Sequence, residues 1–502
     1  MKRRTFIRST LAATAAAVAP WPRSLAALYQ EAPATPPDVI AVTGDGREVT
    51  LASSAIADLT ARVRGRVLLA GDGGYDQARQ VLNPSFDKRP ALIAQVTGTA
   101  DVRTAVDFAR ENDGLLLAVK CGGHSASGKS TCDLGMMIDL SPFRDVRVDP
   151  LARTARVTGG SLLGQVDHES MAYELVTPMG TVSHTGVGGL VTGGGFGRVA
   201  RRFGLSVDNL LSVDVVTADG ALRQASADEN PDLFWGVRGG GGNFGIVTSF
   251  QFRLHAMPRR LLAGVILFPL SRARDVLRLY GDYGPEAPDE LQIELIMAQG
   301  PGGQPGVAGF AVCYSGAPGQ AERALAPLRG LDTPIVDDVA AIDYVALQRS
   351  GDTDDPRAIA SYLKSGFVSE IPQTLVDAIV DGFETHVGRS TQIVFQQSGG
   401  AIGSVAPGAT AFPQRDAIAN MMGIIAWPHG QDGSEHIEWC RQYWTRLEPF
   451  THGFYANDGD PDASAQATLE NYRQNLERLV AVKNRYDPTN LFRLNANVQP
   501  TV

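Results

Sequence analysis

The first half of the chain, from about residue 37 to residue 254, alternates short apolar runs with segments of helical periodicity. The runs at 91–96 and 115–119 are typical of buried strands, and between them residues 100–111 place apolar side chains at helical spacing. Further strands are predicted at 136–140, 155–157 and 211–217. Glycine-rich segments join these elements, so we expect an α+β fold for this half.

The second half changes character between about residues 260 and 451. Strand-like runs occur at 262–268, 294–297, 309–314 and 392–395, and helical stretches separate them. The turns are rich in Gly and Pro, as in residues 301–306. This pattern predicts a second domain built on an antiparallel sheet with helices, and residues 466–486 predict a final helix.

The first residues have the order of an export signal. Lys2, Arg3 and Arg4 precede the apolar stretch 11–19, and small residues follow at 24–27. Arg3-Arg4-Thr5-Phe6-Ile7-Arg8 also resembles the twin-arginine motif, which the twin-arginine export machinery of bacteria reads on proteins that cross the membrane folded. We therefore expect residues 1–26 to be removed and the mature protein to be periplasmic or secreted, a route that suits a protein loaded with a cofactor before export.

Charge narrows the classes of partner. The formal net charge is −9, and it becomes −14 without residues 1–26, because that segment holds five basic and no acidic residues. Nucleic acids and anionic membranes are negatively charged and bind positively charged proteins best, so neither is expected as the main partner. No later apolar run reaches the roughly 18 residues of a transmembrane helix, so we expect no membrane span in the mature form.

Glycine is unusually frequent, with 55 of 502 residues, against a usual share of about 7%. The densest run is 180–197, with eight glycines in eighteen residues. Each glycine costs a helix about 1 kcal/mol relative to alanine, so we expect a loop here. Glycine also lets main-chain N–H groups approach a ligand such as a pyrophosphate, although a purely structural cluster of turns remains the alternative.

A second cluster, 239–245, contains a formal G-x-G-x-x-G in Gly240, Gly242 and Gly245. A dinucleotide fingerprint would have to open a helix, whereas residues 246–252 alternate as a strand. The cluster is therefore not interpreted as a nicotinamide site.

A third cluster follows the predicted strand at 115–119. Here Gly122 and Gly123 precede His124. The two glycines allow the backbone to lie against a flat ligand, and an imidazole there can attack an electrophilic cofactor carbon. A histidine with a structural role is the alternative.

Taken in order, these clusters, together with residues 232–247 and the tail 486–497, resemble FAD-linked oxidases of the vanillyl-alcohol-oxidase superfamily, and within it the berberine-bridge-enzyme-like oxidoreductases. The resemblance extends from about Arg89 to the end of the chain. It implies an α+β fold with a two-lobed PCMH-type FAD-binding domain at 37–258 and a substrate domain at 259–452 built on an antiparallel sheet with helices. Residues 453–502 would form a berberine-bridge-like segment that returns to the FAD domain.

The resemblance also implies a cofactor, FAD, bonded covalently through His124. A second covalent bond in many relatives comes from a cysteine at the position of Val182, so a single attachment is expected here. The cofactor-binding residues that it implies are Lys120, Gly122, Gly123, His124, Ser125, Gly128, Gly186, Val187, Gly188, Gly189, Gly193, Gly194, Gly197, Gly245, Ile246, Val247, Asn495 and Asn497.

For catalysis the resemblance points to Tyr455 as the group that takes a proton while hydride passes to flavin N5. A tyrosine has a reference pKa near 10, so that of Tyr455 would have to be lowered. Gln397, beside Gln396, is expected to orient a substrate hydroxyl, and Ser398 stands where relatives often have a tyrosine. His184 departs from the usual residue of its loop and is a further candidate for contact with flavin or substrate. The histidines do not have metal-ligand spacing, and no metal is expected.

Three functions remain open at this stage. The first is an oxidase that takes hydride from an alcohol or amine carbon of a small molecule, a sugar or a secondary metabolite, and passes electrons to dioxygen to give H₂O₂. The second is a dehydrogenase with another electron acceptor, since Thr185 stands where relatives admit or exclude dioxygen. The third is a flavin- or ligand-binding protein without turnover.

Overall fold

The computed structural model describes residues 36–300, 302, 304–353, 355, 357–459 and 462–502. The predicted export signal at 1–26 lies outside the described residues. Helices and strands are mixed along the described chain, which confirms the α+β class. Among the described residues no helix is long and apolar enough to cross a membrane.

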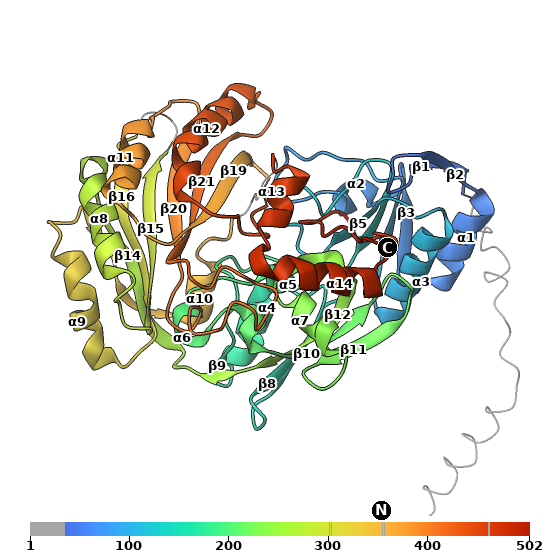
Figure 1. The fold of residues 1–502 in the computed structure, drawn as a ribbon, viewed down its shortest axis with the longest axis horizontal. Helices are drawn as coiled ribbons and strands as arrows, with labels where there is room; N and C mark the ends of the chain where they lie inside the picture. Colours follow the sequence, from blue (N-terminus) through green and yellow to red (C-terminus); the bar gives the residue numbers. More distant parts are fainter. Residues whose placement is uncertain (1–35, 301, 303, 354, 356, 460–461) are drawn as a thin grey trace, which may run out of the picture.

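The N-terminal lobe contains β1 (Val39–Val42), β2 (Glu48–Leu51), α1 (Ser53–Arg62), β3 (Arg66–Leu69), α2 (Tyr75–Ala78), β4 (Leu92–Gln95), α3 (Thr99–Glu111), β5 (Leu117–Lys120) and β6 (Met136–Asp139). Its main sheet has the order β3-β4-β6-β5, with β4, β6 and β5 parallel (blue in Figure 1). Helix α3 forms as predicted, because Val102, Ala105, Val106 and Ala109 bury one face. The Asp101 carboxylate accepts the Thr97 and Arg64 N–H groups and so fixes the start of α3 on the strand loops.

The second lobe contains β7 (Val146–Asp149), β8 (Thr154–Thr158), α4 (Leu163–Met171), β9 (Leu175–Val176), α5 (Val187–Gly193), α6 (Ala200–Phe203), β10 (Leu210–Val216), β11 (Leu222–Ser226), α7 (Pro231–Val237), β12 (Ile246–Arg253) and β13 (His255–Ala256). Its antiparallel sheet has the order β11-β10-β12-β8-β7. Because β12 follows the cluster 239–245, the interpretation that this cluster is no dinucleotide fingerprint is confirmed.

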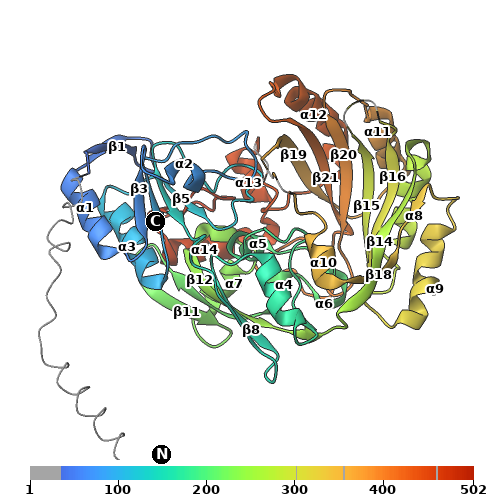
Figure 2. The ribbon, with the colours of Figure 1, turned by 180° about the vertical axis from the view of Figure 1, so that it is seen from behind.

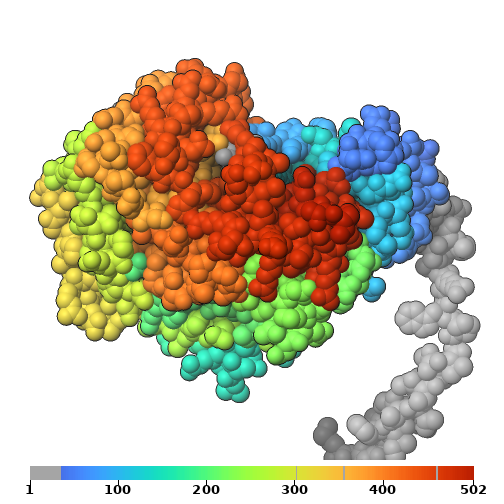
Figure 3. All heavy atoms as spheres, viewed as in Figure 1, coloured from blue at the N-terminus to red at the C-terminus, as the bar shows by residue number. Residues whose placement is uncertain are grey.

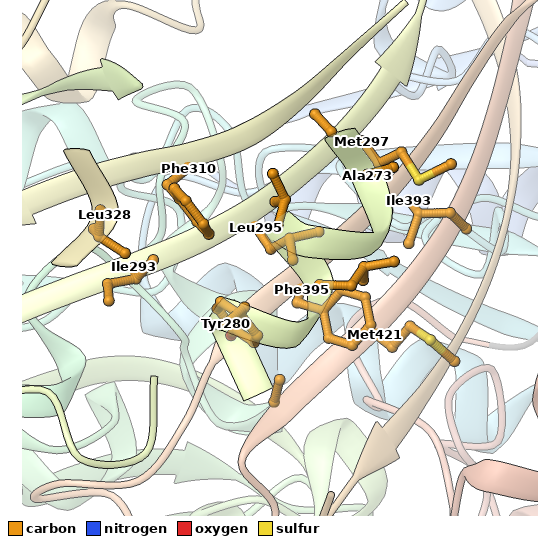
Figure 4. Close-up of a cluster of buried hydrophobic side chains, with 14 of the residues drawn as sticks. Ala273, Tyr280, Ile293, Leu295, Met297, Phe310, Leu328, Ile393, Phe395 and Met421 are labelled. Atoms are coloured by element: carbon orange, nitrogen blue, oxygen red, sulfur yellow. The ribbon is translucent and has the colours of Figure 1, made fainter. Parts of the chain in front are cut away.

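The next domain contains β14 (Arg260–Pro269), α8 (Ala273–Tyr283), β15 (Leu291–Gln299), β16 (Val307–Tyr314), α9 (Pro318–Arg329), β17 (Val336–Asp337), β18 (Ala340–Asp343), α10 (Tyr344–Arg349), β19 (Ile359–Val368), α11 (Gln373–Gly382), β20 (Ser390–Gln397), β21 (Ala419–Pro428) and α12 (Ser434–Leu447). The strands form one antiparallel sheet in the order β17-β14-β16-β15-β20-β21-β19, and β18 also pairs with β14. Helices α8, α9, α11 and α12 lie along one face of it (Figure 1). Alternate residues of β15, such as Ile293, Leu295 and Met297, are buried under these helices beside Tyr280 and Phe395 (Figure 4).

The C-terminal tail runs back to the first two lobes and lies across the middle of the molecule (red in Figure 3). The structure differs from two of the predictions of secondary structure. The single helix predicted at 466–486 is wrong: it is divided into α13 (Ala465–Glu470) and α14 (Leu476–Tyr486), because Arg473 between them has a φ of 48° that a right-handed helix does not contain. The run 180–197, predicted as loop, contains the short helix α5, whose Val187 and Val191 are buried one turn apart.

Candidate active site

A cavity of about 370 Å³ lies where the loops after β5 and before α5 meet the start of β12 and the tail. Figure 2 shows α5 near the middle of the molecule, between the N-terminal lobe and the eight-stranded sheet. The predicted site residues that line this cavity are Gly122, Gly123, His124, Ser125, Gly186, Gly188, Gly189, Gly245, Ile246, Val247, Asn495 and Tyr455. The structure thus brings the three glycine clusters and the tail together around one space.

Four predicted glycines do not line the cavity: Gly128, Gly193, Gly194 and Gly197. Two of them lie in close contact with other parts of the protein. A Cβ on Gly197 would lie 1.5 Å from the Met179 carbonyl oxygen, and one on Gly193 would lie 2.1 Å from Asn457 Oδ1. Their role as cofactor-binding residues stays a prediction.

Three further predicted residues also lie away from the cavity lining: Lys120, Val187 and Asn497. The Lys120 ammonium is buried, donates to the Ala78 carbonyl and lies 3.7 Å from Asp139 Oδ2. Val187 is fully buried in the core of the second lobe. Both pack within the elements behind the site, and the cofactor-binding role of all three residues stays a prediction.

The glycines that do line the cavity serve two purposes. Gly122 and Gly186 face each other, because a Cβ on either would lie 2.3 Å from the backbone nitrogen of the other. A Cβ on Gly189, Gly241 or Gly242 would meet no atom within 4 Å, although all three line the cavity. This open space beside exposed main chain fits a flat or phosphate-bearing ligand.

Replacing Gly189 by Val therefore tests the cavity as the cofactor site. The variant is expected to fold, since open space surrounds the added side chain, but to lose binding of FAD. Gly186→Val is the matched comparison: it collides with Gly122 and is expected to lower thermal stability as well. Fluorescence titration of apoprotein with FAD, beside thermal unfolding, measures both. A Gly189→Val variant that binds FAD like the wild type would contradict the assignment.

His124 lines the cavity within a network of polar groups. Its Nε2 lies 2.6 Å from His184 Nδ1, and its Nδ1 lies 3.2 Å from Thr185 Oγ1. Burial, and next the neighbouring His184, lower the pKa of His124 to about 4. His124 is therefore neutral at neutral pH, the form in which an imidazole is a nucleophile.

Tyr455 reaches the cavity from the tail, as predicted. Its hydroxyl oxygen accepts hydrogen bonds from the Gly195 N–H and from Asn457 Nδ2, both at 2.7 Å. Burial nevertheless raises the pKa of Tyr455 above its ordinary value. The condition for a tyrosinate base is not met by these residues, and the protonated hydroxyl is suited to donate a hydrogen bond into the cavity.

Gln397 is not at the cavity. Its Oε1 accepts the Ile293 N–H at 2.6 Å and its Nε2 donates to the Gly284 carbonyl at 2.7 Å, so its side chain is used inside the domain. Because side chains alternate along β20, the neighbouring Gln396 lines the cavity in its place. The expected role of Gln397 in orienting substrate is corrected to Gln396.

Sequence reasoning missed Asp458, which also lines the cavity. Its Oδ2 accepts a hydrogen bond of 2.8 Å from Asn420 Nδ2, and the same amide lies 3.1 Å from Gln396 Oε1. Burial raises the pKa of Asp458 to about 6. Its carboxylate is thus ionised at neutral pH and poised to take a proton. The signal in the sequence was an acid directly after Tyr455-Ala456-Asn457.

Comparison with known proteins agrees with this geometry. A family model described as an FAD binding domain matches residues 90–226, and one described as berberine and berberine like matches residues 454–499. (R)-6-hydroxynicotine oxidase of Paenarthrobacter nicotinovorans is 30% identical over 87% of this chain and 97% of its own. This chain belongs to the berberine-bridge-like FAD-linked oxidoreductases. The α+β fold with a PCMH-type FAD-binding domain is thereby confirmed.

Other members of the family are similar over most of their length. Xylooligosaccharide oxidase of Thermothelomyces thermophilus is 32% identical over 83% of this chain and 89% of its own. The crystal structure of a carbohydrate oxidase from Microdochium nivale superposes with a TM-score of 0.80 at 26% identity, covering 89% of this chain and all of that one. The protein is an FAD-linked oxidoreductase.

The cavity fits FAD on its own chemistry. Ser130 Oγ and Asn495 Oδ1 are buried at the cavity without a partner among the described residues, so a ligand can use both. Lys129, which sequence reasoning also missed, lines the same region and donates to the Asn495 carbonyl at 2.9 Å. A cation and open glycine main chain in the lining of one cavity suit a pyrophosphate.

Proposed function

We propose that this oxidoreductase is an exported oxidase that carries FAD on a single covalent bond to His124. It would oxidise an alcohol or amine carbon of a small molecule and pass the electrons to dioxygen, giving H₂O₂. The observation that carries this proposal is the single cavity that joins the neutral His124 and open glycines to Tyr455, Gln396 and Asp458. Relatives whose names describe oxidases of 6-hydroxynicotine and of xylooligosaccharide support the reaction class.

FAD supplies a hydride acceptor at N5. The residues of this chain do the rest: the Tyr455 hydroxyl, held by two donors, hydrogen-bonds the substrate heteroatom, and Gln396 orients it. Loss of hydride from the carbon requires that the O–H or N–H proton leave as the C=O or C=N bond forms. Asp458, with a pKa of about 6, takes that proton.

The tether is tested by a visible spectrum before and after acid precipitation. We expect the wild-type pellet to stay yellow, and the His124→Ala pellet to be colourless even if its soluble form binds FAD. Yellow colour that leaves the wild-type pellet would retain the fold and remove this role of His124. A protein that takes up no FAD would overturn the proposal as a whole.

Substrate and acceptor are tested on the same holoenzyme. Anaerobic bleaching of the flavin by xylobiose and by (R)-6-hydroxynicotine is compared first, followed by readmission of air. Rapid reoxidation with stoichiometric H₂O₂ is the expected result. Slow reoxidation in air, with fast reoxidation by a quinone, would identify the dehydrogenase instead.

Export rests on the sequence of residues 1–26. Changing Arg3 and Arg4 to Lys is expected to retain the protein in the cytoplasm of a bacterial host with twin-arginine export, as measured by fractionation. Unchanged export of that variant would remove the twin-arginine route.

A further inference from the structure

A second histidine lies directly behind the proposed attachment site. His184 Nδ1 is 2.6 Å from His124 Nε2, and the two ring centroids are 4.6 Å apart. His124 lines the cavity and His184 does not, so His184 contacts the imidazole of His124 rather than the cavity itself. The proposed function so far gives His184 no role.

A carboxylate faces the other nitrogen of His184. Asp352 Oδ1 is 4.0 Å from His184 Nε2, and Asp352 Oδ2 accepts a 2.6 Å hydrogen bond from the Ser183 hydroxyl. Arg349 Nε lies 3.8 Å from Asp352 Oδ2. Asp352, His184 and His124 thus lie in a row that runs from an exposed carboxylate at the surface to the cavity.

The charge of Asp352 favours one pair of tautomers. At 4.0 Å the carboxylate is too far from His184 Nε2 for a hydrogen bond, but its negative charge favours a proton on that nitrogen and leaves the lone pair of His184 on Nδ1. The short contact then requires that His124 donate from Nε2. The remaining nitrogen of His124, Nδ1, keeps its lone pair and is the nucleophile.

We infer that His184, oriented by Asp352, activates His124 for the covalent attachment of FAD. The inference rests on the proposed function, because it concerns the bond proposed there. His184 acts through His124 and is therefore a positioning residue, not a catalytic residue of substrate oxidation.

The attachment balances as follows. His124 Nδ1 forms a bond to the flavin 8α carbon as one C–H bond of that carbon breaks, and the two electrons pass to the flavin ring. The C–H proton goes to solvent, and the Nε2 proton of His124 goes to His184, where Asp352 stabilises the resulting cation. Dioxygen then takes the two electrons and two protons as H₂O₂, which restores the oxidised cofactor.

The test is a time course of attachment after FAD is added to apoprotein. Covalent flavin is read as fluorescence on a denaturing gel and as the intact mass of protein plus FAD less two hydrogens. His184→Asn retains a hydrogen-bond acceptor but no base, and it is expected to slow attachment about 10²-fold or more. The exposed His168→Asn is the matched control and is expected to attach at the wild-type rate.

Further readouts separate activation from a structural effect. Non-covalent FAD affinity should be unchanged in His184→Asn, and added imidazole should restore attachment in His184→Ala. The flavin-bearing peptide should be linked through Nδ1. This inference alone is overturned if His184→Asn attaches FAD at the rate of the wild type. It is also overturned if the flavin is linked through Nε2 of His124. A wild-type protein without covalent flavin overturns the tether and this inference together, while FAD binding and oxidation are unaffected.

Discussion

Replacing Asp458 by Asn is expected to reduce the rate of flavin reduction by 10²- to 10⁴-fold, the usual contribution of a positioned general base. The amide retains the shape of the side chain and a partner for Asn420, but it cannot take a proton. Because the pKa of Asp458 is raised to about 6, the wild-type kcat/KM should rise with pH through that region and level off above it. In Asp458→Asn this acidic limb should be absent. Stopped-flow measurement of flavin reduction between about pH 4.5 and pH 8, in steps of about half a pH unit, measures both effects. The substrate is whichever of xylobiose and (R)-6-hydroxynicotine bleaches the flavin.

Asp416→Asn is the control for the same substitution. Asp416 forms a surface ion pair with Arg473 and does not line the cavity. The variant Asp416→Asn should retain the wild-type rise of kcat/KM near pH 6 and the wild-type rate of flavin reduction. If Asp458→Asn keeps the limb near pH 6 and Tyr455→Phe removes it, Tyr455 takes the proton after all, as the sequence predicted. Retention of FAD and of thermal stability in each variant separates chemistry from misfolding.

The sequence predicted which segments meet, and the structure decided which side chains face the cavity. The glycine clusters and the tail could be recognised because runs of glycine and their order along the chain are visible in one dimension. The sequence could not distinguish Gln396 from Gln397, because alternation alone does not say which of two neighbouring side chains faces the cavity. The pairing of β20 with β15 decides this. A shift of one residue exchanges the cavity face for the core face.

The contacts among His124, His184 and Asp352, and the raised pKa of Asp458, also could not be predicted from the sequence. His124 and His184 are 60 residues apart, and Asp352 belongs to a loop after α10 in the next domain. Their meeting depends on long-range packing that no local pattern reports. The pKa of Asp458 likewise depends on burial by β20, β21 and the tail together, which the motif around Tyr455 does not reveal.

The tail motif also contains the ion pair with the largest expected effect on stability. Lys483 and Asp487 of the α14 end are fully buried, with Nζ 2.6 Å from Oδ2. Lys483 also donates to the Asn243 and Phe492 carbonyls, and Asp487 accepts the Leu491 and Phe492 N–H groups. The pair therefore fixes the returning tail, including Phe492 at the cavity, against the glycine cluster 239–245.

Lys483→Met should lower the free energy of unfolding by about 3–5 kcal/mol, because it leaves the Asp487 charge buried without its partner. The urea midpoint of the apoprotein should fall at an unchanged slope. Arg485→Met, on the same helix, removes an ion pair with Asp232 whose arginine is 62% exposed, and should cost no more than about 1 kcal/mol. Adding Asp487→Asn to Lys483→Met removes the unpaired charge and should restore part of the loss. If the double variant is no more stable than Lys483→Met, the cost lies in packing and the unpaired charge is not its cause.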